Sequence, residues 1–255
     1  MVDKWLNYIL SKYLPQPCAI CGGPCNDPMA SGLCRGCKQE LPVLAECCLG
    51  CSNPLEDSHS LMSDRPWSQL VQTRYCGRCL ASPPSYDHSI SFFPYRSPFK
   101  QLVTALKFNA TLSHARLLGQ LFAEQLCMTL DETEFRPDVI LPVPLHVTRL
   151  RQRGFNQSLE IARPISKQFD IPLQPMLVER QRATQPQSSL SLKQRKKNIK
   201  GAFTVTSPID HKHVAIVDDV MTSGATVDAL AATLKQHGVE TVSVWCICRA
   251  LPLSK

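Results

Sequence analysis

One stretch constrains the fold of this chain more than any other: Val214-Ala-Ile-Val-Asp-Asp-Val-Met-Thr-Ser-Gly-Ala-Thr226. The four apolar residues at its start predict a buried strand. Asp218 and Asp219 come next, at the carboxyl end of that strand, where open α/β sheets place their ligands. A short loop follows, and a helix is expected to begin after it. The stretch therefore predicts a strand–loop–helix unit with a ligand site at the turn.

The loop Thr222-Ser-Gly-Ala-Thr226 has the chemistry of a phosphate site. Gly224 lets the backbone turn tightly, and successive N–H groups at a helix N-terminus supply a positive field. The hydroxyls of Thr222, Ser223 and Thr226 can donate to phosphate oxygens, with Ala225 completing the loop. The acid pair before the loop can accept hydrogen bonds from a vicinal diol and hold Mg²⁺. A diol beside a phosphomonoester describes a ribose 5-phosphate, whereas Walker A and Rossmann fingerprints are absent.

Apolar runs and helical periodicity alternate through the second part of the chain. The predicted strands are 89–95, 138–145, 176–178, 214–217 and 241–247, and the predicted helices are 98–107, 114–130, 157–169 and 227–237. Ser97 and Pro98 are interpreted as the N-cap and first residue of the first helix. This alternation predicts an α/β domain over residues 85–255, with a mostly parallel sheet covered on both faces.

Cysteine dominates the first part of the chain, where ten of thirteen cysteines precede residue 80. The pairs Cys18/Cys21 and Cys34/Cys37 are separated by twelve residues, and Cys48/Cys51 and Cys76/Cys79 by twenty-four. Each tetrad offers four thiolates for one tetrahedral, structural Zn²⁺. The surplus Cys25 and Cys47 could each replace a neighbouring ligand, and His59 is a fallback in the second gap. Cys127, Cys246 and Cys248 are interpreted as small core residues.

The chain has no clean export signal and no apolar run long enough for a membrane helix. We therefore expect a cytoplasmic protein without membrane insertion, in which metal ligation explains the cysteines better than disulfides do. Residues 1–84 are expected to hold a short N-terminal amphipathic helix and the metal-binding domain. The formal net charge of +7 is compatible with phosphate-bearing partners.

The region 180–201 carries seven cations and no acid. They are Arg180, Arg182, Lys193, Arg195, Lys196, Lys197 and Lys200. A long polar loop in a compact domain is usually functional or disordered, and a solvated charge run is the alternative interpretation. A further arginine cluster at 149–153 follows the strand that ends at Leu141-Pro-Val-Pro144, and the planar guanidinium suits phosphate oxygens.

The phosphate loop resembles the signature of type I phosphoribosyltransferases, and the whole chain resembles the ComF/GntX family, its GntX branch above all. Besides the loop and the cysteine pairs, the resemblance rests on Leu106-Lys-Phe108, Arg153-Gly-Phe-Asn-Gln157, Arg182-Ala-Thr184 with Gln187, Arg195-Lys-Lys-Asn198 and Val244-Trp-Cys-Ile-Cys-Arg249. It implies a double zinc ribbon before a type I phosphoribosyltransferase fold. It also implies a role in natural transformation and in the use of external DNA as a nutrient.

The resemblance also implies functions for the basic residues. Arg149, Arg153 and Arg182 would stabilise pyrophosphate as it leaves phosphoribosyl pyrophosphate, with Mg²⁺ bound alongside. Two hypotheses follow, a phosphoribosyltransferase with an undefined acceptor and a non-catalytic single-stranded DNA-binding protein. In the second, the zinc ribbons and the residues Arg195, Lys196 and Lys197 would contact DNA, and DNA-uptake components are possible partners. Purine phosphoribosyltransferases carry an acid at the first position of the phosphate loop. This chain has Thr222 there and in this respect resembles orotate-type enzymes.

Overall fold

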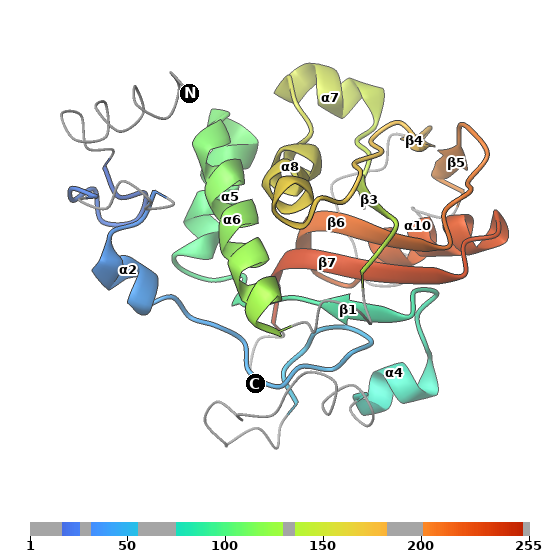
Figure 1. Cartoon of the computed structure of the whole chain (residues 1–255), viewed down its shortest axis with the longest axis horizontal. Helices are drawn as coiled ribbons and strands as arrows, with labels where there is room; N and C mark the ends of the chain where they lie inside the picture. The colour runs from blue at the N-terminus through green and yellow to red at the C-terminus, as the bar shows by residue number, and fades with distance from the viewer. Residues whose placement is uncertain (1–16, 26–31, 56–74, 130–135, 183–200, 252–255) are drawn as a thin grey trace.

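A parallel sheet forms the centre of the molecule. The computed structural model describes residues 17–25, 32–55, 75–129, 136–182 and 201–251 (Figure 1). Its sheet consists of β1 (His88–Ile90), β2 (Phe93–Pro94), β3 (Val139–Pro142), β6 (His213–Met221) and β7 (Thr241–Arg249). The order is β1-β7-β6-β3, β2 also pairs with β7, and every pairing is parallel. The carboxyl ends of β3, β6 and β7 therefore meet at one edge.

Helices cover both faces of this sheet (Figure 1). On one face lie α5 (Phe99–Asn109), α6 (Leu112–Thr129) and α8 (Gln157–Phe169), and α10 (Ala225–Gln236) covers the other. The alternation along β6 explains why both faces are apolar: Ala215 and Val217 belong to the first core, while Val214 and Ile216 belong to the second. The predicted α/β architecture is thereby confirmed.

Smaller elements surround the sheet. The short helices are α2 (Arg35–Gln39), α4 (Gly77–Ala81) and α7 (Val147–Arg153). The strands β4 (Val178–Arg180) and β5 (Phe203–Val205) pair antiparallel and bracket the basic segment, so that Arg180 lies opposite Phe203. Among the helices described, none is long and apolar enough to cross a bilayer.

Several element boundaries differ from the prediction. The run 89–95 forms two short strands, and between them the Phe92 carbonyl accepts the Leu44 N–H (2.7 Å). β6 extends to Met221, so the acid pair lies within the strand. Pro98 occupies the cap position of α5, and Ser97 instead accepts a hydrogen bond from the Gln101 side chain (3.1 Å).

Two further expectations were wrong. Residues 147–153 form the helix α7, which the sequence interpretation did not include. Cys127 is exposed, because it lies on the outer side of α6, whereas Cys246 and Cys248 are fully buried in the core as expected.

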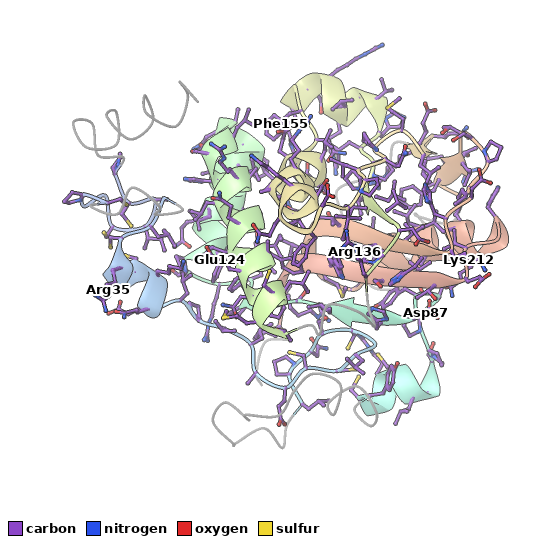
Figure 2. The ribbon with its side chains drawn as sticks, viewed as in Figure 1. Arg35, Asp87, Glu124, Arg136, Phe155 and Lys212 are labelled. Atoms are coloured by element: carbon purple, nitrogen blue, oxygen red, sulfur yellow. The ribbon has the colours of Figure 1, made fainter. Side chains whose placement is uncertain are left out.

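The two cysteine segments pack in different places on the α/β core (Figure 1). The first lies beside α6: Cys18 and Leu33 join the same apolar core, and Lys38 of α2 pairs with Glu124 of α6 (2.8 Å). Figure 2 shows Arg35 of α2 and Glu124 on this side of the molecule. The second segment lies against β1, where the Ser89 N–H donates to the Leu49 carbonyl (2.7 Å). Both cysteine segments contact the α/β core. The domain boundary between residues 84 and 85 stays a prediction.

Candidate functional site

The acid pair lies at the carboxyl edge of the sheet. Asp218 is opposite Cys246 in β7, and the neighbouring residue Val217 is opposite Pro142, the last residue of β3. The Val143 N–H donates to the Val217 carbonyl (2.9 Å), which brings the loop after β3 directly beside the acids. The edge thus joins two predicted ligand loops, as the topology of a parallel sheet requires.

A hydrogen-bonded chain fixes the Asp218 carboxylate. Its Oδ1 accepts from the Ser158 hydroxyl and from the Asp219 N–H, each at 2.9 Å. Ser158 is buried in the first turn of α8, whose N-cap Asn156 accepts from the Ser158 N–H (3.0 Å). The Asn156 side chain also donates to the Val143 carbonyl (3.0 Å). The start of α8 therefore holds both the acid and the β3 loop in place.

The two carboxylates have different environments. Burial and the neighbouring Asp219 carboxylate raise the pKa of Asp218 to about 7. Asp219 is 3% exposed and forms an ion pair with Lys107 of α5. Burial lowers the pKa of Lys107, but the charge of Asp219, the hydrogen bond to it and the charge of Asp218 together outweigh burial, so the net direction is upward. Lys107 is a site residue for which the sequence interpretation assigned no role, although it lies within a motif that carried the resemblance.

Arg153 and Arg180 lie near the acid pair, and Arg149 lies near both of these arginines. Arg149 and Arg153 lie on α7, and Arg180 ends β4 with its guanidinium 5.7 Å from the Phe203 ring centroid. Burial lowers the pKa of Arg180, the charge of Arg149 lowers it further, and Asp218 opposes both effects. Burial likewise lowers the pKa of Arg153, against the charge of Asp219. The acid charges therefore act on Arg153 and Arg180, each of which is also affected by the charge of Arg149.

The phosphate loop has the geometry expected of an anion site. Gly224 adopts φ 78°, a left-handed conformation that favours glycine, and caps α10. Thr222 is exposed, and Ser223 accepts the Ala225 N–H (3.3 Å). Ala225 and Thr226 belong to the first turn of α10. The loop thus presents hydroxyls and helix N–H groups beside the acid pair.

The remaining predicted residues lie at or beyond the edge of the described chain. Arg182 is exposed, two residues past Arg180. Arg195, Lys196, Lys197 and His59 lie outside the described residues, as does the predicted N-terminal helix. Phe155 is an aromatic residue that follows the arginine cluster 149–153. It is partly buried against the core just before α8 (Figure 2).

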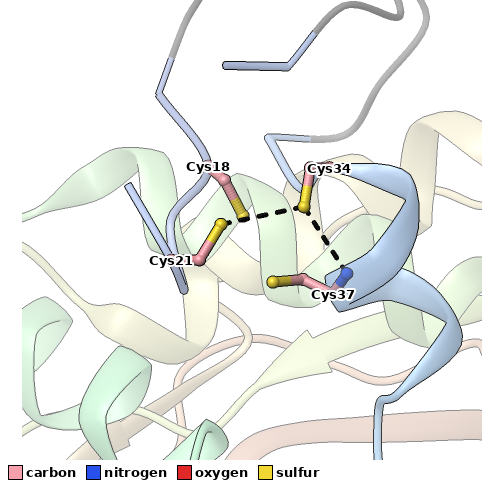
Figure 3. A group of neighbouring side chains, drawn as sticks. All are labelled: Cys18, Cys21, Cys34 and Cys37. Carbon is pink, nitrogen blue, oxygen red and sulfur yellow. Dashed lines mark hydrogen bonds between the residues drawn. The ribbon is translucent and has the colours of Figure 1, made fainter. Parts of the chain in front are cut away.

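Within each cysteine tetrad, the four sulfurs lie close together. In each, the four sulfurs lie within 4.8 Å of one another: Cys18, Cys21, Cys34 and Cys37 in the first, and Cys48, Cys51, Cys76 and Cys79 in the second. Figure 3 shows the first tetrad, where the Cys34 sulfur accepts the Cys37 N–H (3.5 Å). In the second, the Cys48 sulfur accepts the Cys76 N–H (3.1 Å). Four thiolates at this spacing fit a closed tetrahedral metal site.

The sulfurs within each tetrad differ in pKa. Burial raises the pKa of Cys18, but backbone N–H groups of Cys21 and Cys34 outweigh it and bring the pKa to about 6. A hydrogen bond from Cys48 lowers the pKa of Cys51 to about 4 against burial. Hydrogen bonds with neighbouring sulfurs and burial raise the pKa of Cys37 and Cys48, and burial and the charge of Cys51 raise the pKa of Cys79. Cys25 and Cys47 do not belong to either group.

A comparison with protein families identifies the class of the α/β domain. Residues 156–252 match the phosphoribosyl transferase domain family. Together with the fold, this match defines the class: a phosphoribosyltransferase-type α/β domain that carries two four-cysteine groups. A purine phosphoribosyltransferase structure from Pyrococcus horikoshii is 22% identical, with a TM-score of 0.30 over 53% of this chain and 82% of that chain.

Two relatives extend the likeness over most of the sequence. DNA utilization protein YhgH from Salmonella typhimurium is 35% identical over 222 residues, which cover 86% of this chain and 98% of that protein. Competence protein F from Haemophilus influenzae is 30% identical over 224 residues, covering 86% and 91%. The chain therefore belongs to the ComF/GntX family, which includes these proteins.

Proposed function

We propose that this chain binds phosphoribosyl pyrophosphate at the carboxyl edge of its sheet and acts in the use of external DNA. One observation carries the binding proposal: Asp218 and Asp219 lie near the carboxyl end of a buried strand, shortly before the phosphate loop, with Arg153 and Arg180 close to them and Arg149 beside these arginines. This places acceptors for a diol between donors for two phosphate groups. Phosphoribosyl pyrophosphate has that order of groups.

Each part of the site would meet one part of the ligand. The acid pair would accept hydrogen bonds from the ribose hydroxyls, and the loop 222–226 would bind the 5-phosphate through hydroxyls and N–H groups. When bound with the ligand, Mg²⁺ would neutralise charge on the pyrophosphate. The Lys107 ammonium already compensates Asp219, so the acid pair is not left with two uncompensated charges.

Transfer would break the bond between C1 of the ribose and the pyrophosphate oxygen. The electron pair leaves with the pyrophosphate, and the acceptor atom forms the new bond to C1 and loses its proton. Arg149, Arg153 and Arg182 would stabilise the charge that develops on the leaving group, and Arg180 joins them by position. Stabilisation of such charge is usually the largest contribution to catalysis.

The DNA part of the proposal rests on the relatives, whose names refer to DNA utilization and competence. A cytoplasmic protein that handles incoming strands would fit these names. Arg195, Lys196 and Lys197 would contact phosphates of single-stranded DNA, and components of the uptake machinery would be partners. Structural Zn²⁺ would occupy both cysteine groups.

The second hypothesis, a single-stranded DNA-binding protein without turnover, is favoured by the seven cations in 180–201. Release of pyrophosphate distinguishes the two. The enzyme would release it from phosphoribosyl pyrophosphate in the presence of a nucleobase or a DNA acceptor. The binding protein would retain phosphoribosyl pyrophosphate intact under the same conditions.

Calorimetry with Mg²⁺ tests the binding proposal. Asp218→Asn keeps an oxygen for Ser158 but removes the charge that the diol needs. A charged hydrogen bond contributes roughly 1.5–3 kcal/mol, so affinity for phosphoribosyl pyrophosphate should fall about tenfold to over a hundredfold. Asp210→Asn changes an exposed acid before β6 and is the matched control. Equal affinity of parent and Asp218→Asn would show that the site is misplaced.

A further inference from the structure

The second cysteine group is attached to strand β1 of the sheet. The turn that carries Cys48 and Cys51 is fastened to β1 by two buried contacts. The Ser52 and Ser89 hydroxyls lie 2.9 Å apart, and the Leu49 carbonyl accepts the Ser89 N–H (2.7 Å). Both serines are at most 2% exposed. The position of this turn relative to the sheet is therefore well defined.

Tyr86 connects that turn with the phosphate loop. Its ring is 5% exposed, and its hydroxyl donates to the Gly50 carbonyl (2.7 Å). The same hydroxyl oxygen is 3.5 Å from the place where a Cβ on Gly224 would lie. The Tyr86 hydroxyl thus lies between the cysteine turn and the residue at which the phosphate loop turns.

Arg249, the last residue of β7, contacts the start of the phosphate loop. It is 2% exposed, and its Nη1 donates to the carbonyls of Met221 (2.7 Å) and Thr222, where the phosphate loop begins. Burial lowers the pKa of Arg249, and the Cys51 thiolate opposes this effect. The guanidinium therefore holds the first carbonyls of the phosphate loop.

The sulfurs determine where the turn can lie. A Cβ on Gly50 would be 2.9 Å from both Cβ and Sγ of Cys79, closer than real Cβ atoms approach. The Gly50 peptide therefore packs on the Cys79 side chain without space between them. If the sulfurs separated, the Gly50 carbonyl would lose its support and Tyr86 its acceptor.

We propose that Tyr86 is a positioning residue through which the second cysteine group supports the phosphate loop, whose first carbonyls Arg249 holds from β7. A divalent cation held by Cys48, Cys51, Cys76 and Cys79 keeps the Gly50 carbonyl in place. The affinity of the loop for a phosphomonoester then depends on the metal content of this group. The affinity part of this inference rests on the proposed function, whereas the support of the loop does not.

Hydrogen exchange of the peptide 220–228 tests the support without any ligand. Cys76→Ser should remove one zinc ion per chain and speed amide exchange in this peptide, while amides of β3 at the opposite edge keep the parent's rate. Tyr86→Phe leaves the cysteines intact and should also speed exchange in 220–228. Tyr75→Phe is the matched control, because its hydroxyl donates to the Asp87 carbonyl (3.4 Å), away from the loop.

Calorimetry with ribose 5-phosphate then tests the affinity. Loss of the Tyr86 hydroxyl should weaken binding roughly three- to tenfold, as expected for one hydrogen bond, while Tyr75→Phe binds like the parent. Unchanged exchange in both Cys76→Ser and Tyr86→Phe would overturn the inference, as would equal acceleration in β3. If exchange in 220–228 is faster in the variants than in the parent but the parent does not bind ribose 5-phosphate, the proposed function is refuted. The support of the loop is then still established.

Discussion

Lys107 Nζ forms an ion pair with Asp219 Oδ2 at the carboxyl end of β6, and the two side chains are only 22% and 5% exposed. The pair joins helix α5 to strand β6, which carries the acid pair. Its burial means that neither charge is solvated well by water, so each depends on the other. Lys107 therefore has a structural and an electrostatic function in the same site.

Removal of Lys107 should destabilise the fold. Lys107→Met leaves the buried Asp219 carboxylate without its partner, and the free energy of unfolding should fall by roughly 3 kcal/mol in urea titrations. Lys100→Met is the matched control, since Lys100 is exposed on the same helix. The double variant Lys107→Met with Asp219→Asn should recover part of the loss. No recovery would mean that Lys107 stabilises α5 by packing alone.

Zinc content should be close to two ions per chain, measured by elemental analysis of untagged protein. The eight sulfurs of the two tetrads account for both ions, so Cys25→Ser and Cys47→Ser should each retain two. Cys34→Ser should lower the content to about one. A preparation of the parent with a single ion would show that one tetrad is not a metal site.

Single-stranded DNA binding should depend on the basic segment. Replacing Arg195, Lys196 and Lys197 by Ala removes up to three phosphate contacts. The slope of the logarithm of the binding constant against the logarithm of salt concentration should flatten by roughly 0.7 for each lost contact. Titrations at several salt concentrations measure this slope. An unchanged slope would place the DNA contacts elsewhere, for example on the cysteine segments.

Acid should destabilise the protein through His88. Burial and then the charge of His213 lower the pKa of His88 to about 4, and its Nε2 lies 2.8 Å from the Ser243 hydroxyl. The unfolded chain has the ordinary histidine pKa of about 6.5, so it binds the proton first as the pH falls. Stability present above pH 6.5 is therefore lost progressively down to about pH 4, by roughly 2–3 kcal/mol for this residue.

The test compares His88→Gln with the parent. The variant can still hydrogen-bond Ser243 but has no proton to gain, so its free energy of unfolding should fall less between pH 6.5 and pH 4.5. Protonation of the cysteine sulfurs affects both proteins alike and cancels in the difference. Parallel pH profiles would show that His88 does not contribute to acid sensitivity.

Local patterns determined much of what the sequence predicted. The helix 157–169 begins and ends where expected, because Asn156 is an N-cap and the apolar residues recur at helical spacing. The phosphate loop and the cysteine pairs are also local, since each is defined by residues a few positions apart. Such spacing specifies a turn or a helix without reference to the rest of the chain.

Contacts between distant residues depended on the tertiary structure. Lys107 and Asp219 meet because α5 and β6 pack side by side, and Tyr86 reaches Gly50 because β1 joins the sheet next to β7. The exposure of Cys127 likewise depends on which side of α6 packs on the core. Periodicity states that a residue lies on a face, but the sheet order and the packing of helices decide what that face meets. The sequence alone therefore determined the chemistry of the loop and of the cysteine groups. Only the fold decided that Tyr86 lies between one cysteine group and the loop.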